Sequence, residues 1–349
     1  MTVEDDIQFE IRGKIALVTL NRPKALNALT QEMCVALKAQ LEDWDKDKNV
    51  AAVVIEGTGE KAFCAGGDIV RLYNEGRAKG DYPYQFYRDE YLVNAAIKHF
   101  SKPYIALIDG IVMGGGVGVS VHGSQRIATE NTLFAMPETG IGLFPDVGGS
   151  YFLPRCPGKL GLYLGLTGAR LKAADAVYAG IATAYVPASR LEDLKAALAD
   201  GATDADAVSQ IISDFRKDPG TAPLAEIMGE IDRFFEAESM LALLTGLEEA
   251  EGSAFARDTA KLLRKKSPTA LRLTFDQLSK GATLDFDDCM RMEFRMVNRV
   301  IQGLDFYEGT RATVIDKDQR PLWNPANLEA VGDAEIADYF APLDGGELY

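Results

Sequence analysis

Short apolar runs alternate with amphipathic segments through the first half of the chain. Two such runs between Ile7 and Leu20 flank Gly13, which predicts two strands joined by a turn, and an amphipathic helix is expected from Thr30 to Trp44. Further strands are expected at AAVVIEG near Ala51, PYIALIDG near Pro103, Gln125 to Thr129 and Thr132 to Phe134. Strands and helices in this order predict an α/β core of stacked strand and helix units.

Beyond about Val186 the strand signals fade and helical periodicity takes over. The segments LEDLKAALAD, PLAEIMGEIDRFFEA and SAFARDTAKLLRKK each gather apolar residues on one helical face. In SPTALRLTFDQLSK, Ser267 is the expected N-cap and Pro268 the first helical residue, where its missing N–H costs nothing. We expect a core in residues 1–190 and a mainly helical region in residues 191–349 packed on it.

The charge and composition of the chain limit the kinds of molecule that it could bind. The 349 residues carry a formal net charge of −15 with no extended Lys/Arg-rich run, so the chain lacks the basic face that nucleic acid requires. The longest stretch without charged residues, Gly110 to Gln125, is too short and too rich in glycine to span a bilayer. We expect neither a nucleic-acid partner nor a membrane segment.

The spacing of the cysteines indicates whether the chain holds a metal site, and the N-terminal residues indicate the cellular compartment. The four cysteines form no C-x-x-C pair, which argues against a metal site and fits a reducing compartment: Cys34, Cys64, Cys156 and Cys289. The N-terminal residues MTVEDDIQFE are acidic and resemble neither a secretory signal nor a transit peptide. The sequence therefore predicts a cytoplasmic protein.

Two glycine-rich turns follow apolar strands. FCAGGDI leads into a helix that Asp68 could cap, and MGGG leads into a helix expected to run on through Val121, so the amides of Gly67 and Gly115 point outward at helix starts. Two such donors that converge form an oxyanion hole for a carbonyl oxygen that gains negative charge. A single cluster is better explained by a tight turn, but the pair favours the oxyanion hole.

Nucleotide-binding motifs are the alternative explanation for glycines after a strand. Val119 and Val121 stand where a G-x-G-x-x-G run would need its third glycine, and no G-x-x-x-x-G-K-[ST] sequence occurs. These motifs are excluded.

Two carboxylates stand alone in AMPETGIGLFPDVGG. Glu138 and Asp146 are the only charges of this apolar segment, and partial desolvation should raise their pKa values toward the range useful for proton transfer. The alternative is that either residue caps a helix or pairs with Arg126 or Arg155. Glu90, on an expected helix, would by itself be taken for a solvated charge.

Nucleophilic triads are not evident. His99 and His122 are the only histidines, and neither accompanies a serine in a G-x-S-x-G turn. Cys64 lies in the first glycine turn without a partner base and is interpreted as a buried structural thiol. Acid and base chemistry is therefore expected from carboxylates.

FCAGGDI, PYIALIDG and the GGG turn together resemble the crotonase (enoyl-CoA hydratase/isomerase) superfamily. The resemblance implies a spiral of ββα units with a helical C-terminal region, a CoA site in the core, and an oxyanion hole for a thioester at Gly67 and Gly115. It implies no cofactor, because CoA is part of the substrate. Trimers recur in the superfamily, so a homo-oligomer is an open possibility.

The hydratases of the superfamily use two glutamates, and this chain has Gly118 at the first position and Glu138 at the second. The absent acid argues against hydration. FAMPETGIGLFPDVGGSYFLPR and DFYEGTRATVIDKDQRPLWNP instead resemble the branch of 3-hydroxyisobutyryl-CoA hydrolases of valine degradation. In that branch the positions of Glu90, Gly115, Glu138 and Asp146 contact the substrate or act on it.

The resemblance implies that the chain hydrolyses a short 3-hydroxyacyl-CoA thioester, with Glu138 as nucleophile or as general base and Asp146 assisting. Arg22 and Lys24, in NRPKALNAL, are candidates for binding the CoA phosphates, although ordinary surface charges explain them equally well. An enoyl-CoA hydratase or isomerase and a non-catalytic CoA-binding protein remain the alternatives.

Overall fold

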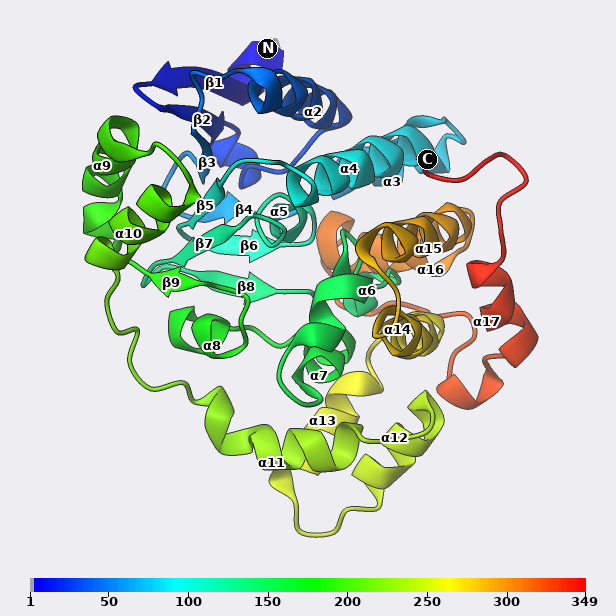
Figure 1. Cartoon of the computed structure of the whole chain (residues 1–349). Coiled ribbons are helices and arrows are strands. Elements are labelled where there is room, and N and C mark those ends of the chain that lie inside the picture. Colours follow the sequence, from blue (N-terminus) through cyan, green and yellow to red (C-terminus); the bar gives the residue numbers. More distant parts are fainter. Residues whose placement is uncertain (1–2) are drawn as a thin grey trace. The chain divides into compact units, whose positions relative to one another are not determined.

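A computed structural model describes residues 3–349 of the chain, coloured along the sequence in Figure 1. Contacts between residues divide the chain into two compact units. Unit 1 comprises Met1–Gly67, Asp89–Phe134 and Leu171–Ala225, and unit 2 comprises Asp68–Arg88, Ala135–Arg170 and Glu226–Tyr349. Each unit is described by itself.

Unit 1 is built on a six-stranded sheet with the order β1-β2-β3-β5-β7-β9. Its strands are β1 (Ile7–Arg12), β2 (Ile15–Leu20), β3 (Ala52–Gly57), β5 (Tyr104–Ile108), β7 (Gln125–Ala128) and β9 (Ala184–Tyr185). β1 and β2 form the expected antiparallel hairpin around Gly13, whose φ of 56° suits glycine, and the other strand pairs are parallel. Both faces of β2, β3 and β5 are buried, which explains why these strands are continuous apolar runs.

Helices of unit 1 bury one face of this sheet. Alternate strand residues such as Leu17, Val54 and Leu107 pack against Leu198 of α9 (Leu191–Gly201) and Ile212 of α10 (Ala205–Phe215). Figure 1 shows both helices beside the sheet. The remaining helices of the unit are α1 (Val3–Asp6), α2 (Gln31–Lys46), α5 (Gly115–Gly118), α8 (Ala173–Tyr178) and the part of α4 (Tyr82–Lys98) from Asp89 onward.

A second sheet has three strands in the order β4-β6-β8: β4 (Ala62–Cys64), β6 (Ile111–Met113) and β8 (Leu133–Ala135). β4 and β6 are parallel neighbours. Their carboxyl ends therefore lie at the same edge of the sheet, and each end runs directly into one of the glycine turns.

Unit 2 is mainly helical. It contains α3 (Ile69–Arg77), α6 (Gly149–Phe152), α7 (Leu160–Thr167), α12 (Met240–Glu248), α13 (Ala254–Leu263), α14 (Pro268–Gly281), α15 (Phe286–Val300), α16 (Asp305–Thr310) and α17 (Asp333–Phe340), with most of α11 (Leu224–Phe235). Short turns complete it: the 3₁₀ helices η2 (Glu138–Ile141), η3 (Leu153–Arg155) and η6 (Leu328–Ala330), and a π turn over Arg311–Ile315.

The structure confirms most of the expected elements. Thr30 and Ser267 cap α2 and α14 through their side chains, and Asp68 caps α3. The helix expected to run on through Val121 is wrong, because α5 ends at Gly118. The hydroxyl of Ser120 donates to the carbonyl of Gly116 at 2.8 Å and competes for the helical acceptors, in a segment already weakened by glycine.

The helical C-terminal region is also confirmed, since every element after β9 in the described chain is helical. The division of the sequence at residue 190 is not tested by the two interleaved units and stays a prediction. No helix within residues 3–349 is long and apolar enough to cross a membrane.

Candidate functional site

The two glycine turns of unit 1 meet at their backbones. A Cβ atom built on Gly115 would lie 3.3 Å from the amide nitrogen of Gly67. The neighbouring residues Gly66 (φ 118°) and Gly114 (φ 47°) turn the backbone so that the two segments can approach. Both need glycine, because other residues rarely adopt such backbone conformations. Among the backbone hydrogen bonds of residues 3–349 outside regular elements, none has Gly67 or Gly115 as donor. The two turns are thus neighbours in space, and the oxyanion hole at Gly67 and Gly115 stays a prediction.

Glu90 lies against the second glycine turn, at Gly115. It is a residue of α4 with only 1% of its surface exposed, and its Oε1 atom lies 2.2 Å from the Cβ position built on Gly115. Only glycine leaves room for the carboxyl group here. The interpretation of Glu90 as a solvated charge is therefore wrong, and a carboxyl group adjoins the amides within unit 1.

Asn27 holds the first glycine turn in place, although nothing in the sequence singled it out beyond its place in a polar loop. Its side-chain amide donates to the carbonyls of Thr58 and Ala62 at 2.9 Å each, and its Oδ1 accepts from the Arg22 amide. Asn27 is fully buried with a φ of 57°, a conformation that asparagine tolerates better than most residues. This loop therefore positions β4, and with it the turn at Gly67.

The two basic residues of that loop differ in their surroundings. The guanidinium of Arg22 donates to the carbonyl of Ala28 at 2.6 Å and lies 3.5 Å from the carboxylate of Asp6. Lys24 is exposed. Arg22 therefore has a structural role in the loop, whereas Lys24 projects a charge into solvent.

In unit 2, Glu138 opens the η2 turn and is only 4% exposed. Burial raises the pKa of the Glu138 carboxyl well above its usual value, the neighbouring Asp146 raises it further, and Lys266 opposes both effects. Burial in turn lowers the pKa of Lys266. The expected desolvation of Glu138 is thus present, and the residue is a strong base once it is ionised.

Asp146 is also buried, with 3% of its surface exposed. The two arginines considered as its partners are engaged by backbone oxygens: Arg155 donates to Tyr151 and Leu284 at 2.6 and 2.9 Å, and Arg126 donates to Ile181 at 2.6 Å. Asp146 is thus a buried carboxylate that raises the pKa of another one, Glu138. Such pairs are typical of proton-transfer sites.

The turn with Glu138 is held by α16 through close backbone contacts. A Cβ atom on Gly142 would lie 2.4 Å from the carbonyl of Asp305, and one on Gly309 would lie 2.5 Å from the carbonyl carbon of Ile141. The amide of Ser267 also donates to the carbonyl of Thr139 at 3.1 Å. The motif DFYEGTRATVIDKDQRPLWNP, which contains Gly309, therefore packs against the turn that carries Glu138.

Cys64 does not behave as a nucleophile. The thiol is fully buried, and this burial raises its pKa to about 12, so that it stays protonated at neutral pH. The interpretation as a structural thiol is confirmed.

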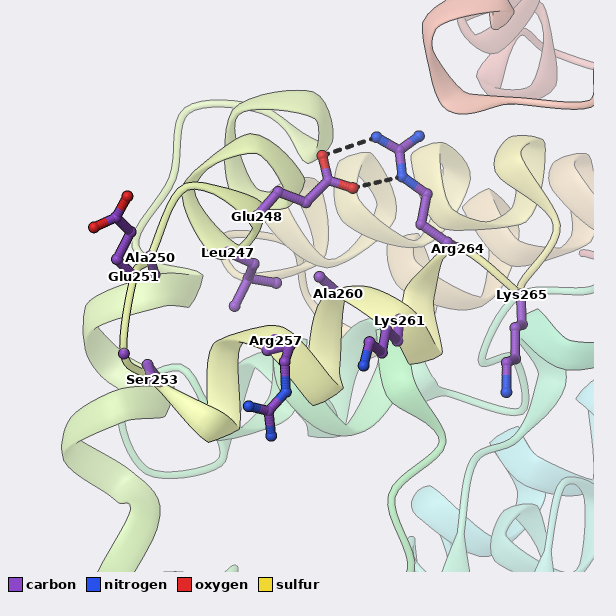
Figure 2. Close-up of a pocket in the computed structure, with 11 residues that line it drawn as sticks. Leu247, Glu248, Ala250, Glu251, Ser253, Arg257, Ala260, Lys261, Arg264 and Lys265 are labelled. Atoms are coloured by element: carbon purple, nitrogen blue, oxygen red, sulfur yellow. Dashed lines mark hydrogen bonds and ion pairs between the residues drawn. The ribbon is translucent and has the colours of Figure 1, made fainter.

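A cavity of about 700 Å³ lies in unit 2 between α12 and α13, and Figure 2 shows the residues around it. Arg264 forms an ion pair with Glu248 at 2.8 Å beside it, as Figure 2 shows. Arg257 pairs with Asp258 at 3.0 Å. None of the residues predicted for the site lines this cavity.

The profile of the enoyl-CoA hydratase/isomerase family matches residues 15–340. The chain belongs to this family. The predicted fold class, a crotonase-like α/β core with a helical C-terminal region, is confirmed by that match and by solved structures of the family.

Curated relatives and solved structures carry different names. A protein of Danio rerio, 48% identical over 98% of this chain and 91% of its own length, and one of Homo sapiens, 42% identical over 99% and 90%, are both named mitochondrial 3-hydroxyisobutyryl-CoA hydrolase. A solved structure from Mycobacterium thermoresistibile, titled carnitinyl-CoA dehydratase, has a TM-score of 0.92, 40% identity and coverage of 99% of this chain and 98% of its own. One from Rhodobacter sphaeroides, titled enoyl-CoA hydratase, has a TM-score of 0.89, 38% identity and 99% coverage of both chains.

The mitochondrial names contradict the prediction of a cytoplasmic protein. That prediction rested on the acidic residues at the N-terminus. Compartment is decided by targeting segments that are separate from the fold, so a folded domain's own composition is a poor guide to it.

Glu138→Gln is expected to stabilise the protein increasingly as pH rises. The native protein holds the Glu138 proton to a higher pH than the unfolded chain, which releases it above about pH 4.5, so ionisation opposes folding up to the raised native pKa. Relative to the variant, the parent should lose up to about 1.4 kcal/mol of unfolding free energy per pH unit in this window. Urea midpoints at pH 4.5 and pH 7.5 measure the difference.

Glu226→Gln is the matched control, because Glu226 is an exposed residue of α11. Its urea midpoints should follow those of the parent at both pH values. If the urea midpoints of Glu138→Gln and the parent differ by the same amount at pH 4.5 and at pH 7.5, the raised pKa of Glu138 is contradicted.

Proposed function

We propose that the protein hydrolyses a short 3-hydroxyacyl-CoA thioester, with 3-hydroxyisobutyryl-CoA as substrate and 3-hydroxyisobutyrate and CoA as products, as in valine degradation. The observation that carries this proposal is that Gly118 stands where the hydratases of the family have their first catalytic glutamate, while Glu138 and Asp146 are both buried. The names of curated relatives at 42–48% identity support it.

Hydration or isomerisation of an enoyl-CoA is the second candidate. The titles of the two solved structures, a dehydratase and a hydratase at 40% and 38% identity, favour it. Hydration needs one group to activate water and one to deliver a proton to the neighbouring carbon. With Gly118 at the first position, the family's usual pair is incomplete, so we rank this candidate second.

In the proposed mechanism the amides of Gly67 and Gly115 bind the thioester oxygen and stabilise the negative charge that develops on it. Glu138 then acts in one of two ways. As a nucleophile, its carboxylate forms a bond to the acyl carbon, the C–S bond breaks, and the CoA thiolate leaves and takes up a proton; water then cleaves the anhydride and restores Glu138. As a general base, Glu138 removes a proton from the attacking water instead.

The remaining site residues are assigned to the 3-hydroxyacyl group and to CoA. We assign binding of the 3-hydroxyl group to Glu90, and its orientation or a proton transfer to Asp146. Lys24, exposed beside the loop that supports β4, is the better candidate for a CoA phosphate, and Arg22 the weaker one because Ala28 and Asp6 already occupy it.

A panel of three thioesters tests the function. 3-Hydroxyisobutyryl-CoA and 3-hydroxypropionyl-CoA should release free thiol, whereas crotonyl-CoA should keep its enoyl absorbance. Loss of enoyl absorbance without thiol release would favour the hydratase, and binding of all three without either change would favour a non-catalytic CoA-binding protein.

Glu138→Gln should abolish thiol release and leave CoA binding intact, because the amide is neither a nucleophile nor a base. Single turnover in ¹⁸O-water separates the two mechanisms: attack of water on the Glu138 carbonyl of an anhydride leaves ¹⁸O in the protein, whereas general-base catalysis places it in the product. A near-parental rate for Glu138→Gln would refute the assignment.

Gly115→Ala should lower kcat/KM by about 100-fold, the usual effect of losing one oxyanion donor. The new methyl group would lie 2.2 Å from Glu90 Oε1 and must displace the carboxyl group or the turn. Gly332→Ala is the matched control, since a Cβ atom there meets nothing within 4 Å and the φ of −79° suits alanine. Equal kcat/KM values for the two variants would argue against an oxyanion hole at Gly115.

A further inference from the structure

Two side chains of the C-terminal helices hold the backbone of the turn that carries Asp146. Glu293 of α15 accepts from the amides of Gly148 and Ser150 at 2.8 Å each, one with each carboxyl oxygen. Gln277 of α14 donates to the carbonyl of Pro145 at 2.7 Å and to the hydroxyl oxygen of Ser150 at 2.8 Å. All of these groups lie within unit 2, on both sides of Asp146 in the sequence.

The side chains of this network are buried, and they form a chain of hydrogen bonds from Gln277 through Ser150 to Glu293. Glu293, Gln277 and Ser150 each have 0% of their surface exposed. The amide of Gln277 donates to the Ser150 hydroxyl, which in turn donates to Glu293. Burial raises the pKa of Glu293 to about 8, Asp146 adds to this rise, and the donors from Gly148 and Ser150 oppose it. A buried carboxyl group is costly, so its retention calls for a specific reason.

Backbone strain beside Asp146 supplies that reason. Val147, the next residue, has a φ of 51°, a region that β-branched residues almost never adopt, and Gly148 follows with a φ of 87°. Val147 is fully buried, so the strained residue is also tightly packed. Such strain persists only where the surroundings enforce it, and it concentrates at functional sites.

We propose that Glu293 and Gln277 are positioning residues, which fix the strained turn and thereby the direction of the Asp146 side chain during catalysis. This inference rests on the proposed function, because it takes Asp146 to assist the reaction. A purely structural role would make the two side chains matter for folding alone. The two roles differ in what happens to kcat when the protein is still folded and still binds substrate.

Glu293→Gln is the first test. The variant keeps the volume of the side chain but must place its NH₂ group against the N–H of Gly148 or of Ser150, so one donor faces another and the turn shifts. We expect kcat for 3-hydroxyisobutyryl-CoA to fall by about 10- to 100-fold, as small misplacements of catalytic groups do, with KM changed by less than about 3-fold. The dissociation constant for CoA, measured by calorimetry, should remain at the parental value.

Gln277→Met provides an independent test, which also serves if Glu293→Gln does not fold. It removes both donors without a large change in volume and should give the same loss in kcat at an unchanged KM. Asn298→Ala is the matched control: Asn298 is a buried amide on α15 whose side chain donates to Phe294 of its own helix at 2.7 Å. It should lower the thermal midpoint and leave kcat unchanged.

A comparison with Asp146→Asn separates this inference from the proposed function. If Asp146→Asn keeps the parental kcat, the assignment of Asp146 fails and the positioning role fails with it. If Asp146→Asn is slow but Glu293→Gln and Gln277→Met keep the parental kcat, or lose activity only through KM, the positioning role alone is overturned. A loss of kcat in all three variants, with Asn298→Ala unaffected, supports the inference.

Discussion

The candidate oxyanion hole depends on the parallel pairing of β4 with β6. Because parallel neighbours end at the same edge of a sheet, the turns that follow the two strands must meet there. The meeting is closer than side chains allow, and glycine at position 115 is what permits it. The positions of Glu90 and of the loop around Asn27 follow from this geometry, since the first lies against Gly115 and the second braces β4.

Unit 2 supports its carboxylates by a different means. The turn with Glu138 rests on backbone contacts at Gly142 and Gly309, whereas the turn with Asp146 is held by the hydrogen bonds of Gln277 and Glu293. Steric fit of the backbone thus fixes the position of the Glu138 turn, whereas directed hydrogen bonds fix the position of the Asp146 turn. Both place the supporting groups on α14, α15 and α16, so the helical C-terminal region holds both candidate carboxylates as well as building the core of its unit.

The sequence predicted the local features and missed those that depend on distant segments. Apolar runs and glycines were enough for the strands, the turns at Gly67 and Gly115, and the desolvation of Glu138, because each is encoded within about ten residues. Glu90 was misjudged because burial of a charged residue on a helix depends on what covers it. Glu293 gave no signal at all, since its partners lie 143 and 145 residues away in the chain.

The order of the elements along the chain has a consequence for synthesis on the ribosome. In the sheet of unit 1 every strand after β1 pairs with a strand that has already been made, so this sheet can assemble while the chain emerges. The turns with Glu138 and Asp146 cannot do the same, because Gln277, Glu293 and Gly309 are translated more than 120 residues later than the groups they hold. Until then, the two turns lack the hydrogen bonds and backbone contacts that hold them. The sheet of unit 1 can therefore be completed before the segments that place the two acid residues have been made.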